Sequence, residues 1–331
     1  MERRSVSVGN TTYGVGNTHG GYMADLWNAT VSPNASIYDR DGIDLIHFSN
    51  DTDNQRIELR AGYVSDAFGL IGNIAISAGT TTEHYIAGSC QDRVTGNSAR
   101  NYIDGRDGND VLIGYGGNDR LYGANGNDLL GGGDGSDALH GGNGADRLYG
   151  AAGNDAIYGD AGNDRVYGGD GNDLVGGGSG DDFVFGDSGE DRLYGGYGND
   201  TLYGGSYSDL LNGGPGSDLF NGGGSSDEIT GGSGADKFYH SGTFVDGRDV
   251  ITDFNHSQGD RLFMGGSATR SDFSVVYGHA SDSNGRLGND NIQDAYIVYS
   301  GTGRAVWLLT DGAQVGHMIV TSDGESFDLL A

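Results

Sequence analysis

An aspartate recurs at every ninth residue from Asp92 to Asp236, and this spacing constrains the fold more than any other feature of the chain. Sixteen of the seventeen positions in this register are Asp, and only Asn101 departs from it. Strict self-similarity at a short period is the signature of a solenoid, in which each repeat packs on its neighbours. An apolar residue follows two positions after every register position: Val94, Ile103, Leu112, Leu121, Leu130, Leu139, Leu148, Ile157, Val166, Val175, Val184, Leu193, Leu202, Leu211, Phe220, Ile229 and Phe238.

The chemistry of one repeat predicts how the chain coils. Residues 196–204 read Gly-Tyr-Gly-Asn-Asp-Thr-Leu-Tyr-Gly. Glycines allow positive φ, so the first part of each unit can form a tight turn with inward carbonyls. The three residues centred on the apolar position form a very short strand, with the apolar side chain inward and its neighbours outward. Two repeats therefore make one coil, and the sequence predicts an all-β parallel β-roll with turns stacked about 4.8 Å apart.

The stacked turns are predicted to bind calcium. Ca²⁺ takes six to eight oxygen ligands, which is more than one turn supplies. We expect each ion to lie between two turns eighteen residues apart and to take one Asp from each. On one edge the predicted ligands are Asp110, Asp128, Asp146, Asp164, Asp182, Asp200, Asp218 and Asp236. On the other edge they are Asp119, Asp137, Asp155, Asp173, Asp191, Asp209 and Asp227.

Glycines two residues before these aspartates complete the predicted sites. They are Gly108, Gly117, Gly126, Gly135, Gly144, Gly153, Gly162, Gly171, Gly180, Gly189, Gly198, Gly216 and Gly234. Cys90, Tyr207 and Ser225 replace this glycine, and their turns are predicted to bind weakly or not at all. Asp160 and Asp187 stand where a second glycine is usual, and they either add a ligand or are simply solvated.

Calcium binding and folding are predicted to be one event. Without metal, carboxylates about 5 Å apart repel, and a core one residue wide is too thin to offset chain entropy. We expect roughly a dozen Ca²⁺ ions, each with six to eight oxygen ligands. The alternative is a metal-free solenoid of ordinary Asp-Gly turns, but Asn would serve those turns without the repulsion.

Composition excludes several partners. The chain has 47 acidic and 18 basic residues, for a net charge of −29. This excess argues against nucleic acid or an anionic membrane as partner and for a multivalent cation. No apolar run is long enough to span a membrane, and residues 1–8 have a basic start without the apolar core of a signal peptide. The single Cys90 excludes an intramolecular disulfide framework, so bound metal is the expected source of cross-links that stabilise the fold.

The segment before the repeats resembles a known family. Its motifs are Tyr-Asp-x-x-Gly-x-Asp at 38–44, Gln-x-Ile-x-Leu at 55–59 and Gly-Asn at 72–73. Together with the nonapeptides, which resemble RTX repeats, this order is similar to the C-terminal calcium-binding domain of serralysin-type zinc metalloproteases. The protease motif H-E-x-x-H is absent, so we expect a non-catalytic region. Asp39, Asp41 and Asp44 either bind a further calcium or form a polar turn.

Four segments are expected: an N-terminal extension at 1–34, a sandwich-like β cap at 35–104, the roll at 105–240, and a C-terminal cap with a secretion signal at 241–331. Alternation within 296–299, 305–309 and 317–320 predicts antiparallel strands in the last segment. Asp253 and Asp260 are expected to cap the final turns, with Asp253 also a metal ligand, and Phe254 to plug the core. The ending Asp328–Ala331 is similar to the uncleaved type I secretion signal of serralysins.

The resemblance implies a secreted, extracellular module whose calcium-induced folding is coupled to a type I secretion exporter. Either it is the calcium-binding region of a larger protease, or it is a stand-alone adhesion protein; an enzyme site within 261–331 is disfavoured because no titratable pair there has a recognisable spacing. Outward aromatic residues form one row at Tyr149, Tyr167, Phe185 and Tyr203, and another at Tyr122, His140, Tyr158 and Tyr194. They either pack across strands or form a platform for an extracellular polysaccharide.

Overall fold

The structure is a computed structural model that describes residues 11–14, 35–37, 44–47, 54, 56–60, 64–67, 70–76, 84–241, 247–265, 273–278, 294–299, 304–309, 319–322 and 325–328. Asp39 and Asp41, two ligands of the predicted extra calcium site, lie outside these residues. The chain divides into two compact units, Met1–Gly162 and Asn163–Ala331. In the described residues the only helix is a single 3₁₀ turn at His256–Gln258, and none is long and apolar enough to cross a membrane.

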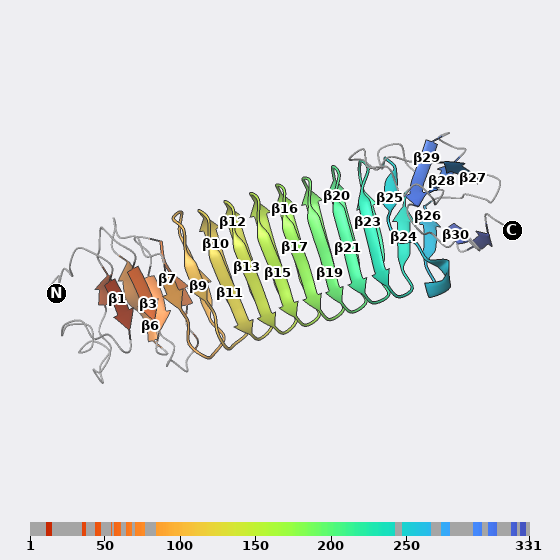
Figure 1. Ribbon diagram of the computed structural model, residues 1–331. Helices are drawn as coiled ribbons and strands as arrows, with labels where there is room; N and C mark the ends of the chain where they lie inside the picture. The colour runs from red at the N-terminus through yellow and green to blue at the C-terminus, as the bar shows by residue number, and fades with distance from the viewer. Residues whose placement is uncertain are drawn as a thin grey trace. The chain divides into compact units, whose positions relative to one another are not determined.

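The first unit consists of two layers of strands (Figure 1). One layer has the order β1 (Thr11–Gly14), β3 (Asp44–His47), β7 (His84–Ile86), β9 (Tyr102–Asp104), β11 (Arg120–Asn125), β13 (Ala138–Asn143), β15 (Ala156–Ala161). The other has the order β2 (Ala35–Ile37), β6 (Leu70–Ile76), β5 (Val64–Ala67), β4 (Arg56–Glu58), β8 (Arg93–Thr95), β10 (Val111–Gly116), β12 (Leu129–Asp134), β14 (Arg147–Ala152).

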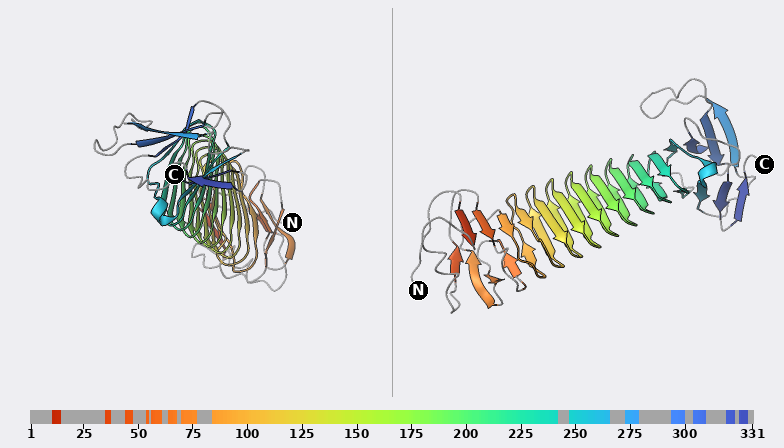
Figure 2. Two further views of the ribbon diagram at one scale, coloured as in Figure 1. Left: turned by 90° about the vertical axis from the view of Figure 1, so that its right-hand side faces the viewer. Right: turned by 60° about the horizontal axis from the view of Figure 1, so that its bottom comes forward.

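The second unit repeats this two-layer arrangement, and Figure 2 shows successive strands alternating between its layers. One layer has the order β17 (Leu174–Ser179), β19 (Arg192–Tyr197), β21 (Leu210–Pro215), β23 (Glu228–Ser233), β25 (Asp249–Ile251), β29 (Arg304–Leu309), β28 (Asp294–Tyr299), β27 (Phe273–Gly278). The other has the order β16 (Arg165–Asp170), β18 (Phe183–Ser188), β20 (Thr201–Ser206), β22 (Leu219–Gly223), β24 (Lys237–His240), β26 (Arg261–Met264), β30 (Ile319–Ser322), β31 (Glu325–Asp328).

The predicted parallel β-roll is confirmed by the strand register. Leu112 lies opposite Leu130 in the first unit and Val184 opposite Leu202 in the second, a step of eighteen residues in parallel strands. All seventeen apolar positions of the repeat are buried, each 0–1% exposed. The core is therefore one residue wide, and each coil buries two side chains between its layers.

The repeat strands are longer than the three residues expected. Strand β10, for example, runs six residues, from Val111 to Gly116. Inter-coil hydrogen bonds continue into the turn, where the Gly117 N–H donates to the Asp134 carbonyl at 2.9 Å. Because these stacked turns have similar backbone conformations, their amides and carbonyls stay in register, and the ladder between β10 and β12 continues past the outward residue after the core position.

Parallel stacking also extends beyond the nonapeptides. On the N-terminal side β3 pairs with β7 and β4 with β8, both parallel, so these strands of the expected sandwich-like segment continue the roll. The strands β4, β5 and β6 pair antiparallel. On the C-terminal side β29 joins β25 in parallel and pairs antiparallel with β28, while β30 and β31 form an antiparallel pair.

The C-terminal end of the core is covered as expected. The ring of Phe254 is fully buried and lies 6.1 Å from that of Phe238. Asp253 accepts hydrogen bonds from the Gly231 and Gly232 amides at 2.8 and 2.7 Å. These contacts satisfy backbone donors and apolar surface that the last repeat would otherwise expose.

Candidate metal centre

The register aspartates are buried in the turns. Every one of the seventeen register side chains is 0–4% exposed, although each Asp carries a group that is charged in water. Burying a carboxylate is unfavourable unless it is paired with a cation or saturated with hydrogen bonds. The partners of these carboxylate oxygens therefore indicate whether the turns bind a cation.

One oxygen of most register carboxylates accepts a hydrogen bond from the backbone of a neighbouring turn. Asp128 Oδ1 accepts the N–H of Asp110 at 2.7 Å, and Asp200 Oδ1 accepts the N–H of Asp182 at 2.9 Å. The same bond to the residue eighteen positions earlier recurs along both edges within each unit, at 2.7 Å in the first and 2.8–2.9 Å in the second. Oδ1 thus links neighbouring turns.

The second oxygen has no hydrogen-bond partner. Fifteen register aspartates have a buried, unsatisfied Oδ2: Asp110, Asp119, Asp128, Asp137, Asp146, Asp155, Asp164, Asp173, Asp182, Asp191, Asp200, Asp209, Asp218, Asp227 and Asp236. Buried carboxylate oxygens without a partner are rare, and each one requires an explanation such as an ion. These fifteen are the aspartates that the sequence predicts as ligands.

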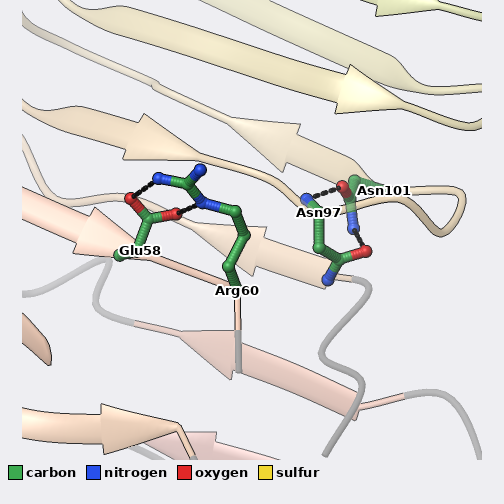
Figure 3. Close-up of polar contacts among 4 residues, drawn as sticks. All are labelled: Glu58, Arg60, Asn97 and Asn101. Carbon is green, nitrogen blue, oxygen red and sulfur yellow. Dashed lines mark hydrogen bonds and ion pairs between the residues drawn. The ribbon is translucent and has the colours of Figure 1, made fainter. Parts of the chain in front are cut away.

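The two register positions before them are satisfied within the protein. Asp92 Oδ2 accepts the Gly88 N–H at 3.1 Å. At Asn101 the side-chain oxygen accepts the Asn97 N–H at 2.8 Å, and its amide donates to Asn97 Oδ1 at 3.4 Å (Figure 3). These turns are therefore closed by side-chain hydrogen bonds, and the run of unsatisfied oxygens begins at Asp110.

The first glycine of each turn makes room for the unsatisfied oxygen. A methyl group on Gly114 would press on Asp119 Oδ2 and lie 2.6 Å from the Gly132 carbonyl oxygen. Similarly, a methyl group on Gly195 would press on Asp200 Oδ2 and lie 2.8 Å from the Gly213 carbonyl oxygen. A carboxylate oxygen and a carbonyl oxygen thus converge beside each of these glycines.

This donor set fits a hard cation. Among the described residues, no group of three or more His, Cys, Asp or Glu side chains is placed to hold a metal ion. The oxygens that converge in these turns are backbone carbonyls together with carboxylate Oδ2 atoms, such as Asp119 Oδ2 and the Gly132 carbonyl beside Gly114. Oxygen-only donors of this kind suit Ca²⁺, whereas zinc and copper prefer nitrogen and sulfur.

The electrostatics of the columns favour a bound cation. Burial raises the pKa of Asp110 to about 8, against the opposing effect of the Asp92 N–H, and nearby Asp128 raises it further. Burial and the neighbouring Asp227 likewise raise the pKa of Asp209 to about 8. Without a cation, these carboxylates favour the protonated form near neutral pH, and a divalent ion would offset the cost of their charge.

Of the three residues that replace the glycine two positions before a register aspartate, Tyr207 and Ser225 lie in strained turns. Glycines at this position have φ between 100° and 157° where it is positive, whereas Tyr207 and Ser225 have φ of 77° and 78°. A left-handed conformation costs a residue with a side chain roughly 1–2 kcal/mol. Cys90 does not adopt a positive φ. The weak binding expected at these three turns stays a prediction.

The two acids that stand in place of a second glycine, Asp160 and Asp187, lie outside the buried columns of register aspartates. Asp160 and Asp187 are exposed and have φ of 73° and 71°. Asp160 Oδ2 lies 3.2 Å from His140 Nδ1, on the outer surface of the roll. This placement favours the solvated alternative over an added ligand for Asp160.

Aromatic rows cover both outer faces. In the first unit Tyr122, His140 and Tyr158 stack with centroids 5.3 and 5.0 Å apart, and Tyr102 and His84 extend the row at tilted angles. In the second unit Tyr167, Phe185 and Tyr203 stack at 4.7 and 5.0 Å, with rings within 5° of parallel. Such cross-strand pairs stabilise the sheets.

A matched pair of glycines tests the role of the first position. Gly114→Ala should lower the free energy of unfolding in saturating calcium by about 1–3 kcal/mol or more, since the methyl group meets Asp119 Oδ2 and a backbone carbonyl. Gly116→Ala should have a small effect, because its methyl group would lie no closer than 3.8 Å to its neighbours. Denaturant unfolding measures both; equal losses would contradict the steric role assigned to Gly114.

Comparison with known proteins agrees with this donor set. The RTX calcium-binding nonapeptide repeat family matches residues 95–130, 131–166, 140–175, 154–184, 176–206 and 203–238. The chain is 36% identical over 92 residues to metallopeptidase AprA of Pseudomonas marginalis, 41% over 88 residues to serralysin B and 44% over 71 residues to serralysin C, both of Dickeya chrysanthemi. Residues 95–238 carry RTX calcium-binding repeats and resemble serralysin C-terminal regions.

These relatives are matched over a small part of their length. The aligned segments cover 20–27% of this chain and 15–19% of the three relatives. The similarity lies in the repeat region and does not extend to a protease domain. The activity of the whole relatives is therefore not transferred to this chain.

Proposed function

We propose that this RTX domain is a non-catalytic, extracellular module whose roll folds when Ca²⁺ binds between its stacked turns. The observation that carries the proposal is the ladder of fifteen buried, unsatisfied Asp Oδ2 atoms. A bound cation at each turn accounts for all of them with one kind of site.

Each ion is proposed to lie between two turns eighteen residues apart. One aspartate from each turn and main-chain carbonyls of the glycine-rich segments would supply its oxygens. Asp119 Oδ2 beside the Gly132 carbonyl is one such pair of donors. Roughly a dozen ions would fill both edges, one for each pair of successive aspartates on an edge, with six to eight oxygen ligands each. Asp253 is proposed to contribute at the C-terminal end, in addition to its amide contacts.

Folding on calcium would couple the module to export. We propose that the chain stays unfolded, and can be threaded through a type I exporter, while calcium is low. Extracellular modules bind calcium at about 10⁻⁴–10⁻³ M, so the higher concentration outside the cell would fold the chain there. The proposed segments are 1–34, 35–104, the roll 105–240, and 241–331 with the secretion signal.

Restoring glycine at the strained turns tests the ligand assignment. The double variant Tyr207→Gly/Ser225→Gly should lower the calcium concentration at the midpoint of folding several-fold, because both turns regain the residue that fits positive φ. Ser208→Gly, an exposed change beside Tyr207, is the control and should leave the midpoint unchanged. Circular dichroism during calcium titration gives the midpoint; no shift in the double variant would count against calcium sites at these turns.

A secretion assay tests the export proposal. In a bacterium carrying a type I exporter, the full chain should reach the medium, whereas a variant ending at Phe327 should stay in the cells. Both proteins should fold equally well with calcium when purified. Equal export of the two would contradict the proposed signal at Asp328–Ala331, without affecting the calcium sites.

A further inference from the structure

One outer face of the second unit combines basic and aromatic side chains. Strands β16, β18, β20, β22, β24 and β26 present two registered rows, which together are named the basic-aromatic face. The first row is Arg165, Phe183, Thr201, Leu219, Lys237 and Arg261. The second row is Tyr167, Phe185, Tyr203, Asn221, Tyr239 and Phe263.

This face is positively charged in a strongly acidic protein. Arg165, Lys237 and Arg261 are exposed, and no ion pair within the described part of the chain includes any of them. Neither row contains an acid; the acids of these strands, Asp170 and Asp187, lie at their turn ends. Arg165 lies 5.4 Å over the Phe183 ring of the same face, a contact that leaves its charge uncompensated. With 47 acidic residues available for 18 basic ones, this segregation lets the three charges attract an anionic partner.

The orientation of the rings selects the chemistry of that partner. Tyr167, Phe185 and Tyr203 stack face to face, so their faces cover one another and their edges line the surface. A neutral sugar stacks on an exposed ring face, which this row does not offer. The edge of an aromatic ring is its electropositive part, and the tyrosine hydroxyls are hydrogen-bond donors. Ring edges, hydroxyls and basic groups all complement an anion.

We propose that the basic-aromatic face binds an extended, carboxylate-bearing polysaccharide lying across the strands. From Arg165 to Arg261 the face spans five strand steps, about 24 Å. It presents an aromatic ring on five of its six strands and a basic group on three of them, at the two ends of the face. A flat surface with a short repeat fits a repeating polymer better than the irregular surface of a folded protein. The inference rests on the proposed function in one respect: the face exists only once calcium has folded the roll.

The opposite layer of the same unit provides a matched control. On β17, β19, β21 and β23 the outward rows are Leu174, Arg192, Leu210 and Glu228, and Gly176, Tyr194, Asn212 and Thr230. One acid and one glycine interrupt these rows. Asn212 and Asn221 occupy the same position of the repeat on opposite layers and are both partly exposed.

The test is calorimetric titration of the calcium-loaded full chain with galacturonate oligomers short enough not to gel with calcium. The unmodified chain should bind them, with affinity falling as salt is raised. Asn221→Glu and the triple variant Arg165→Ser/Lys237→Ser/Arg261→Ser should each weaken binding at least about tenfold. Asn212→Glu and Arg192→Ser should bind like the unmodified chain.

Three results would overturn the proposal: equal binding of the fully methyl-esterified oligomers, stronger binding of polyglutamate or of phosphatidylserine vesicles, or unchanged affinity in Asn221→Glu. Circular dichroism of the same samples separates this proposal from the proposed function. If the chain folds with calcium but binds no oligomer, only the face assignment fails. If calcium induces no folding, the proposed function fails first.

Discussion

With calcium chelated, lowering the pH from about 8 to about 5 should increase the β-structure of the roll. The buried register carboxylates carry the effect. Burial raises the pKa of Asp110 and Asp209 to about 8, and of Asp119 and Asp218 to about 7. In an unfolded chain the same groups titrate near their ordinary value of 3.8.

The sign follows from proton counts. Between the unfolded value near 3.8 and the folded values of about 6 to 8, the folded state binds more protons than the unfolded state. The free energy of unfolding therefore rises as the pH falls through this window, and is lowest above it, where all carboxylates are ionised. Protons would act as a partial substitute for calcium.

Far-UV circular dichroism at several pH values in chelator measures the effect, with light scattering to detect association near the isoelectric point of about 4.2. With saturating calcium the dependence should reverse, since protons compete with the ion for the same oxygens. A β-signal in chelator that falls as the pH is lowered would contradict the assignment of buried register carboxylates with raised pKa values.

Asp200→Asn should destabilise the calcium-loaded protein by about 3–5 kcal/mol, the range for removing one partner of a buried ion pair. Asn keeps the Oδ1 atom that accepts the Asp182 N–H at 2.9 Å. What it removes is the charge that a cation needs. In chelator the same change should stabilise the folded state or leave it unaltered, because burial disfavours the charged form of Asp200.

The reversal of sign between the two conditions is the specific signature. Asp170→Asn is the matched control: Asp170 is exposed and lies outside the buried columns, so its effect should stay within about 0.5 kcal/mol. Denaturant unfolding at saturating free calcium measures the stability of both variants with the ion bound, and far-UV circular dichroism in chelator measures how much β-structure each forms without it. A loss for Asp200→Asn in both measurements would point to a hydrogen-bonding role alone.

The roll could be predicted from the sequence because the aspartates and the core apolar residues recur with the same nine-residue period. A nine-residue repeat with one apolar position forces an eighteen-residue coil, and the pairing of Leu112 with Leu130 has that step. The burial of Phe254 and the amide contacts of Asp253 also follow from the need to cover a solenoid end. Repetition makes the prediction reliable because every repeat has the same pattern and indicates the same backbone geometry.

The flanks could not be predicted to the same degree. The segment 35–104 was expected to form a sandwich-like cap, but β4 and β8 continue the parallel stack, with Ile57 opposite Val94. Short alternating segments outside the repeat have the same pattern in parallel and antiparallel sheets. Only the pairing partner, which lies at an irregular distance along the chain, distinguishes the two.

Part of the site was also missed. The sequence predicts that the repeat glycines adopt positive φ. The glycine five residues before a register aspartate, such as Gly114, does not have a positive φ and instead leaves room for a carboxylate oxygen. The sequence analysis does not predict the hydrogen bond from the Asn97 N–H to Asn101 Oδ1. A single Asn in place of the second glycine of a repeat looks like any other substitution. The two asparagines spaced four residues apart are the signal that could have found it.

The most direct test of the central claim is a calcium titration of the full chain. During the titration, far-UV circular dichroism measures folding and a calcium-selective electrode measures binding. Because folding and binding are proposed to be one event, the two curves should rise together, and chelator should reverse both. In chelator at neutral pH the spectrum should lack β-structure. A fully β spectrum before calcium is added would contradict the account.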